Sequence, residues 1–491
     1  MCKLEQNQFN MLFYKVSFLL FFSVIFCFPL TAQHPYYEKT YPENQLKADL
    51  KAYQKTLETV HAGFYWYTPK AKMDSLFEAT MLEINQPMTE RDFYNKVAAI
   101  TAAINCGHTG TIASPKSRKT LNKKFPLEFQ YLENQVFLSK DYTQGTQPYK
   151  VVKSINKVAI NRIINQIAAL RGTDGFIKSP KPLIVNNSEN FSYWYHLIYP
   201  DSSYEIELAD GQILQRTAIS PEALTKFKQE KKSSYEFLRD SILITDNTAV
   251  LTINSFDKEE LKSGPISYKK HLTQFFKTVK QQGIENLIID LRENGGGEDN
   301  YASLLYRYLT DQTFIYYESM ECKPVPYQGL SGQVYLPSEV KNGLLRNIFI
   351  KQKQGRYFVK PTFRTKGLRK QNPKKDHFSG NLYFLISGKS YSASAEIVAY
   401  AQAYRPNTYF IGQEAGGAIA GNTSALSAYT VFEHTRIAAY IPLVRYTMNI
   451  KNPEFGRGVQ PDYPIIPSVN AYQNGIDEAL EKALELIRNE R

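Results

Sequence analysis

The sequence of 491 residues has few cysteines and, beyond its first 30 residues, no long apolar run. Four cysteines are too few for a disulfide scaffold. A polytopic membrane protein is excluded because a membrane-spanning helix needs about 20 apolar residues. The hydrophobic fraction of 43% and the charged fraction of 22% exclude wholesale disorder and a collagen-like repeat. The chain therefore folds, and two or three domains are expected because single cores rarely exceed about 250–300 residues.

Motifs for metals, nucleotides and nucleic acids are also missing. No zinc or calcium motif occurs, and the glycines at 295–297 are not followed by the Gly-Lys-Ser/Thr of a phosphate loop. The 59 basic and 47 acidic residues give a formal charge of +12, but no nucleic-acid-binding motif accompanies it. We therefore expect no cofactor, no metal and no nucleic-acid partner. The charge predicts a solvated basic surface facing an anionic cell envelope.

The single long apolar run lies at the N-terminus. Residues 16–30 are apolar, basic residues precede them and a short polar stretch follows, which is the layout of a secretory signal peptide. We expect residues 1–33 to be removed by cleavage near Ala32 or Gln33. The mature protein is then expected in the periplasm or cell envelope, or secreted, without an integral membrane span. An uncleaved N-terminal anchor is the alternative.

Three units are predicted after this leader. In residues 34–118 the apolar positions recur at helical spacing, and Thr89 provides a helix N-cap. Residues 119–236 contain short β-branched or aromatic runs and one helical stretch, 161–170, which predicts a small β-rich domain. Residues 237–491 alternate strands with helices, as in an α/β core built on βαβ connections.

Two predicted strands in this core end in residues suited to chemistry. Strand 287–291 is followed by three glycines, and strand 382–386 is followed by a serine-rich stretch that begins a helix. Ligands bind outside the carboxyl ends of strands in open α/β sheets. A serine between a strand and a helix gains oxyanion donors from nearby backbone N–H groups, as an acyl-transfer nucleophile requires. A simple helix N-cap is the alternative role.

Four segments together resemble the tail-specific (C-terminal-processing) serine protease family, in particular its tricorn-like and retinoid-binding-protein-like branch. They are residues 104–109, 287–297, 390–393 and 458–462, which follow one another along the chain in the same order as in the family. The strongest match is 287–297. The resemblance covers most of the mature chain. It implies a crotonase-like (ClpP-like) α/β protease core, an N-terminal helical unit and a PDZ-like substrate-binding module. Residues 151–170 resemble one end of a PDZ domain, with Lys157 where the family usually has glycine.

The resemblance implies roles for particular residues. Counting from strand 382–386 makes Ser392 the nucleophile, whereas counting back from the following helix shifts the match by one residue and keeps Ser394 as an alternative. Backbone N–H groups of Gly296 and Ala393 would form the oxyanion hole.

The base follows from a departure from the family pattern. A Ser-Lys dyad would place a lysine where this chain has Ala418, so the resemblance points instead to His108 in a Gly-His-Thr setting. Histidine suits this work because its ordinary pKa of about 6.5 lies near operating pH. Glu454 is the candidate to orient His108, and an exposed loop carboxylate is its alternative role.

Cys106 stands where the family has aspartate, two residues before His108. A Cys/His nucleophile pair, a buried free thiol and a disulfide with Cys322 are the three alternatives.

Two functions follow. The first is an exported serine endopeptidase that hydrolyses polypeptide tails or unfolded proteins through a serine acyl-enzyme with a histidine base. The second is a catalytically inactive family member that binds a peptide or an apolar ligand. The first is the leading hypothesis, and three features give the second some support: the absent lysine, the shifted serine register and Cys106 in place of the family's aspartate.

Overall fold

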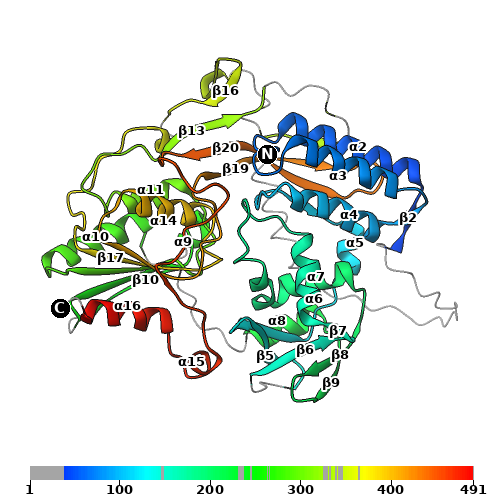
Figure 1. Ribbon diagram of the computed structural model, residues 1–491, viewed down its shortest axis with the longest axis horizontal. Coiled ribbons are helices and arrows are strands. Elements are labelled where there is room, and N and C mark those ends of the chain that lie inside the picture. Colours follow the sequence, from blue (N-terminus) through cyan, green and yellow to red (C-terminus); the bar gives the residue numbers. More distant parts are fainter. Residues whose placement is uncertain are drawn as a thin grey trace, which may run out of the picture. The chain divides into compact units, whose positions relative to one another are not determined.

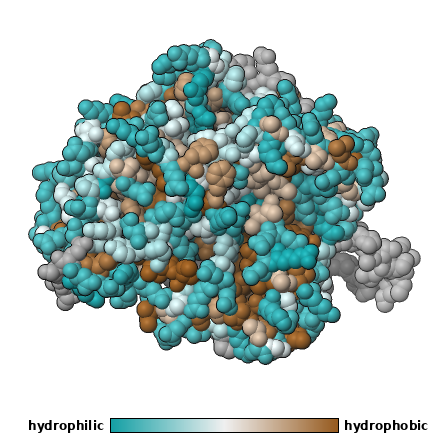
Figure 2. All heavy atoms as spheres, viewed as in Figure 1, coloured by the Kyte–Doolittle hydropathy of each residue, from teal (hydrophilic) through white to brown (hydrophobic). Residues whose placement is uncertain are grey.

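The computed structural model describes residues 38–489 except 145–148, 230–236, 244–245, 263, 265, 325–329, 331–332, 338–339, 341–346 and 363–364. The predicted signal peptide, 1–33, and the predicted domain boundary at 236 lie outside the described residues. In the part of the chain that is described, no helix has the length and apolar character needed to cross a membrane. Hydrophilic side chains cover most of the face in Figure 2, and hydrophobic ones gather in separate patches.

Helices form the N-terminal part, where helical spacing was predicted. They are α2 (Glu43–Val60), α3 (Lys70–Glu83), α4 (Glu90–Ala103) and the short α5 (Pro115–Thr120). The apolar positions of α2, among them Leu46 and Leu50, are buried. Thr89 caps α4, because its hydroxyl accepts a hydrogen bond from the Asp92 N–H at 3.1 Å.

A small antiparallel sheet follows, drawn in cyan and green in Figure 1. Its strands lie in the order β4-β5-β6-β8-β9, with β7 beside β6. Asn156 and Lys157 have φ of 48° and 64° in the turn between β6 and β7, so a lysine adopts the conformation that glycine takes most easily. Helices α6 and α7 pack on the sheet. The bounds are β4 (Leu127–Leu132), β5 (Gln135–Asp141), β6 (Lys150–Ile155), β7 (Val158–Ala159), α6 (Ile160–Ala169), α7 (Ser188–Ile198), β8 (Ser203–Leu208) and β9 (Ile213–Thr217).

The C-terminal part contains the predicted α/β core. Its sheet has the order β10-β11-β12-β17-β18-β21, in which β11 to β21 run parallel and β10 is antiparallel at the edge. Every residue of β12 is buried: Leu287 and Ile289 face one apolar cluster, and Ile288 faces another with helix α16. Burial on both faces explains why this strand shows no alternation. The bounds are β10 (Leu238–Leu243), β11 (Thr248–Ile253), α10 (Tyr268–Gln281), β12 (Asn286–Asp290), α11 (Asp299–Tyr306), β17 (Asn381–Ile386), α14 (Ala393–Tyr404), β18 (Thr408–Gly412), β21 (Tyr463–Pro464) and α16 (Glu478–Asn489).

A second sheet joins the N-terminal helices to this core, which the alternating pattern did not predict. Its order is β14-β19-β20-β13-β16-β15, and β3 from the N-terminal part pairs antiparallel with β20. Figure 1 shows β19 and β20 in orange beside the blue helices. The pairing of β3 fixes the loop just before it, which carries His108. The bounds are β3 (Gly110–Ile112), β13 (Tyr317–Cys322), β14 (Gln333–Tyr335), β15 (Ile350–Lys353), β16 (Arg356–Val359), β19 (Gly421–Val431) and β20 (Ala438–Met448).

Short elements complete the described chain. They are β1 (Thr40–Tyr41), β2 (Met88–Thr89), η2 (Pro182–Asn186), α8 (Pro221–Gln229), α9 (Lys258–Leu261), η4 (Lys366–Leu368) and α15 (Val469–Gln473).

Candidate active site

Ser392 lies at the junction between strand β17 and helix α14, with a backbone conformation that non-glycine residues rarely adopt. Its φ is 53° and its ψ is −127°. Such a conformation costs on the order of 1–3 kcal/mol and persists only where neighbouring contacts hold it. Here the Tyr391 N–H donates to the Asn294 carbonyl at 3.1 Å, and the Ser390 hydroxyl donates to the Leu291 carbonyl at 2.8 Å. These bonds tie the junction to the glycine-rich turn.

His108 lies on the loop between helix α4 and strand β3. The neighbouring Thr109 hydroxyl hydrogen-bonds Nε2 of the buried His61 at 2.8 Å, and Nδ1 of His61 accepts from the Gly63 N–H at 3.0 Å. Burial lowers the pKa of His61 to about 3, so this imidazole is neutral. A structural histidine therefore holds the loop that presents His108.

The structure brings His108 and Ser392 together across 284 positions of the sequence. His108 Nε2 lies 3.1 Å from Ser392 Oγ, which is hydrogen-bond distance and the geometry needed for a base beside a nucleophile. The other ring nitrogen, Nδ1, lies 2.9 Å from the Tyr391 hydroxyl. The Tyr391 and His108 rings also stack, with centroids 4.8 Å apart. Tyr391 thus orients His108 through both its hydroxyl and its ring.

Asp174, from the segment after helix α6, completes the chain of hydrogen bonds. Its Oδ1 accepts from the Tyr391 hydroxyl at 3.2 Å and from the Gly107 N–H at 2.8 Å. Because an ionised carboxylate only accepts hydrogen bonds, the tyrosine hydroxyl donates to Asp174 and accepts from His108 Nδ1. The proton on Nδ1 leaves Nε2 free to accept from Ser392.

Electrostatics at the site favour a neutral histidine. Burial lowers the pKa of His108 below its ordinary 6.5, and the Asp174 carboxylate acts in the opposite direction. Burial likewise raises the pKa of Asp174 and of Tyr391 above their ordinary values. Neutral imidazole is the form that can remove a proton from Ser392.

Glu454, the predicted orienting group, forms no hydrogen bond with His108 among the described residues, where the two ring nitrogens meet Ser392 and Tyr391. It is exposed, and its segment is tied to the loop after Asp174, because the Gly456 carbonyl accepts from the Phe176 N–H at 2.8 Å. The next side chain, Phe455, packs against Tyr67, with ring centroids 5.2 Å apart. Tyr391 occupies the position beside Nδ1 that was expected for Glu454.

The predicted oxyanion donors differ in availability. Ala393 is the first residue of α14, where a helix leaves N–H groups without intrahelical acceptors. Gly296 has φ of 99°, and a Cβ there would lie 2.6 Å from the Ser392 Cβ, so only glycine fits. However, the Gly296 N–H already donates to Asn294 Oδ1 at 2.8 Å. Gly296 therefore shapes the site, whereas Ala393 offers the available N–H.

Neither alternative nucleophile, Ser394 nor Cys106, forms a side-chain hydrogen bond with His108 among the described residues, whereas Ser392 does. Ser394 is fully buried in the first turn of α14. The Cys106 thiol is buried and donates to the Thr423 carbonyl at 3.5 Å, and burial raises its pKa to about 12. Cys106 and Cys322 are both free thiols, so the expected alternative of a disulfide is not realised. Ala418, which stands where a Ser-Lys dyad would place its lysine, packs with Tyr67 and Ile177.

Besides Tyr391 and Asp174, two further contributors were not among the predicted residues. Asn294 is buried and ties the glycine-rich turn to strand β11, since its side-chain amide donates to the Ile253 carbonyl at 2.9 Å. Glu396, one turn after Ser392, is buried against Tyr317 and Asn422, and its pKa is raised to about 7 by burial. Within the described ranges, no three His, Cys, Asp or Glu side chains form a group that could hold a metal ion.

Residues 247–465 match the model of peptidase family S41. The crystal structure of mature CPAF is similar to this chain with a TM-score of 0.60 at 12% identity, covering 91% of this chain and 98% of that chain. A putative peptidase from Parabacteroides merdae gives a TM-score of 0.45 at 12% identity, covering 90% and 96%. The photosystem II D1 C-terminal processing protease gives 0.43 at 13% identity, covering 90% and 97%. No curated protein matches the chain in sequence. The likeness to CPAF indicates a shared α/β fold.

Proposed function

The chain belongs to the tail-specific serine peptidases of family S41, with the family domain at residues 247–465, and we propose that Ser392 and His108 carry out its chemistry. The observation that carries this proposal is the 3.1 Å contact between His108 Nε2 and Ser392 Oγ. A serine-type peptidase acts on polypeptides. The geometry of the site supports the roles of nucleophile, base and oxyanion donor for particular residues.

In the proposed reaction Ser392 Oγ attacks the carbonyl carbon of a peptide bond while His108 Nε2 takes the hydroxyl proton. The carbonyl oxygen becomes an oxyanion that accepts a hydrogen bond from the Ala393 N–H. Collapse of this intermediate breaks the C–N bond, and the imidazolium gives its proton to the leaving amine. Water then attacks the acyl-enzyme ester, again with His108 as base, and releases the acid and the free serine.

Tyr391 and Asp174 act as positioning residues in this scheme. The imidazolium that forms in each step has its positive charge near Asp174, with Tyr391 between them. A carboxylate near an imidazole favours the charged imidazole. Asp174 therefore stabilises the His108 imidazolium that forms when His108 takes the proton of Ser392. The protein would therefore belong to a branch of the family that uses a histidine as its base, as the sequence resemblance implied.

The proposal extends to fold and location. We assign the sheet β10-β11-β12-β17-β18-β21 to a crotonase-like core and the small sheet around helices α6 and α7 to a PDZ-like module that contacts substrate. The predicted signal peptide, 1–33, supports export to the periplasm or cell envelope, where unfolded proteins and polypeptide tails would be substrates.

Hydrolysis of internally quenched peptides and of denatured casein tests the proposal. The wild type and Ser394→Ala should cleave both substrates, whereas Ser392→Ala and His108→Ala should not, with all four chains giving the same circular dichroism spectrum. Full activity in Ser392→Ala, or its loss in Ser394→Ala alone, would contradict the assignment.

A further inference from the structure

A cavity of about 130 Å³ lies against the two segments that carry Ser392 and His108. Tyr391 and Gly107, the chain neighbours of the two reacting residues, both line it. Because consecutive Cα atoms are about 3.8 Å apart, the cavity begins next to the chemistry. The share of liquid volume per water molecule is about 30 Å³, so the cavity has room for a carboxylate and its stem.

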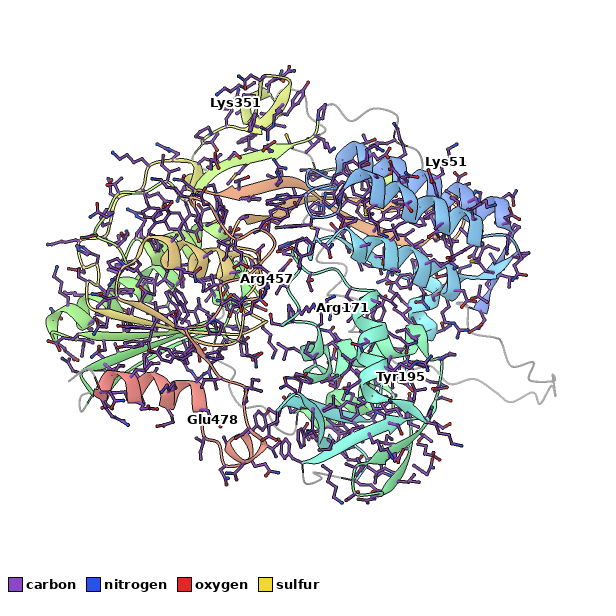
Figure 3. All side chains as sticks on the ribbon, in the orientation of Figure 1. Lys51, Arg171, Tyr195, Lys351, Arg457 and Glu478 are labelled. Atoms are coloured by element: carbon purple, nitrogen blue, oxygen red, sulfur yellow. The ribbon has the colours of Figure 1, made fainter. Side chains whose placement is uncertain are left out.

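Two cations line this cavity. Arg171 follows helix α6 and is labelled in Figure 3, and Lys181 is the N-cap residue just before the short helix η2. The Arg171 guanidinium lies over the Trp194 ring, 5.8 Å from its centroid. A ring face orients the guanidinium without using up the hydrogen-bonding capacity of its N–H groups. Both side chains are half-buried.

Neither cation is neutralised by the protein. Among the described residues, no ion pair or side-chain hydrogen bond is formed by Arg171 or Lys181. No Asp or Glu lines the cavity, and the neighbouring Asp174 directs its Oδ1 to the Gly107 N–H and the Tyr391 hydroxyl. Burial accordingly lowers the pKa of Arg171, with no carboxylate offsetting it.

A second cavity shows the opposite arrangement. It has about 530 Å³ and lies along helix α16. Its cations are already paired, Lys482 with Glu485 at 2.9 Å and Arg488 with Asp246 at 3.0 Å. Unpaired positive charge therefore distinguishes the cavity lined by Tyr391 and Gly107 from this second cavity.

We propose that the cavity lined by Arg171 and Lys181 is a subsite for a carboxylate of the polypeptide substrate. This inference rests on the proposed function, because the substrate must be a polypeptide held at Ser392. A guanidinium binds a carboxylate through two parallel hydrogen bonds, and the lysine ammonium adds a second positive charge. Each extended residue spans about 3.3–3.6 Å, so the bound group lies about one to three residues from the scissile bond.

The carboxylate has two possible sources with the same chemistry. One is an Asp or Glu side chain near the cleaved bond, and the other is the C-terminal carboxylate of a short tail. Both satisfy Arg171 and Lys181. The subsite thus predicts that substrates carry a negative charge at a fixed distance from the bond that Ser392 attacks.

Peptide binding to the full mature chain carrying Ser392→Ala tests the subsite without turnover. The peptides come in matched pairs: Glu against Gln at each of three positions on either side of the scissile bond, and a free against an amidated C-terminus. Calorimetry should give at least tenfold tighter binding for the carboxylate member of one pair. The pair that shows this preference identifies the source of the bound carboxylate, either an acidic side chain at a given position or the C-terminus.

Charge-removing variants assign the preference to the cavity. Arg171→Met with Lys181→Met should reduce the preference below twofold, while the Met side chain keeps an apolar stem over Trp194. Lys178→Met is the matched control, because Lys178 is exposed and lies outside the cavity, and it should keep the preference. Unfolding curves check that the variants fold.

Equal affinities within every pair would overturn the subsite, as would a preference that survives in the double variant. Binding of sodium acetate without any preference between paired peptides would also overturn it, because the ligand would then be a free anion. Hydrolysis of a neutral, amidated peptide by the active chain reports on the proposed function separately. Ser392-dependent hydrolysis without a carboxylate preference removes only the subsite, and a preference without hydrolysis removes only the proposed chemistry.

Discussion

Replacing Tyr391 with Phe removes one hydroxyl from the candidate site and leaves its ring in place. In the wild type this hydroxyl lies 2.9 Å from His108 Nδ1 and 3.2 Å from Asp174 Oδ1. The variant keeps the ring stack on His108, whose centroids are 4.8 Å apart. It therefore separates the hydrogen bond that selects the tautomer from the packing that holds the imidazole.

The size of the effect follows from the loss of a buried hydrogen bond. A buried polar group that loses its partner costs about 1–3 kcal/mol. Since about 1.36 kcal/mol corresponds to a factor of ten in rate, Tyr391→Phe should lower kcat about 5- to 150-fold. KM should change little, because the hydroxyl is bonded within the protein. Steady-state kinetics on an internally quenched peptide measures both.

Tyr400→Phe is the matched control. Tyr400 lies in the same helix region, and its hydroxyl donates to the Ile315 carbonyl at 2.9 Å, away from His108. It should leave kcat unchanged. The reasoning is refuted if Tyr391→Phe keeps the wild-type kcat, or if both variants lose activity equally.

Three further outcomes are expected. Asp174→Asn removes the charge that raises the pKa of His108, so the acid limb of the kcat/KM profile should move to lower pH; a shift to higher pH would contradict this. Glu454→Gln should leave kcat/KM within about twofold of the wild type, measured at pH 7. Burial lowers the pKa of His61 from 6.5 to about 3, so below pH 6.5 the unfolded chain binds a proton that the folded chain does not, and stability falls toward pH 3. At pH 5 this loss is about 2 kcal/mol, and urea unfolding of His61→Gln should lack it.

Much of the α/β core follows from its sequence pattern. Strand 287–291 was predicted from apolar residues without alternation and is observed at Asn286–Asp290. The second sheet was not predicted, because its long strands β19 and β20 lack a regular pattern. Ala425 and Leu426 interrupt β19 with positive φ, at a shift in register between Ser424 and Ser427. A bulge of this kind breaks the alternation from which strands are recognised.

The four residues of the hydrogen-bond chain could not all be predicted from the sequence. Ser392 and His108 lie in recognisable motifs. Nothing in the sequence around Tyr391 indicates a role for its side chain in the site, because its hydroxyl meets His108 only through the tertiary fold. Asp174 lies 66 positions after His108, in a Thr-Asp-Gly turn that resembles any helix-ending loop. Its role depends on tertiary contact with Gly107, which no local pattern encodes.

Covalent labelling tests the central claim, that His108 activates Ser392, most directly. A fluorophosphonate reacts with an activated serine, and mass spectrometry of the digested protein identifies the residue. We predict a single adduct on Ser392, at a rate that falls by two or more orders of magnitude in His108→Ala. An adduct on Ser394, or wild-type labelling of Ser392 in His108→Ala, would contradict it.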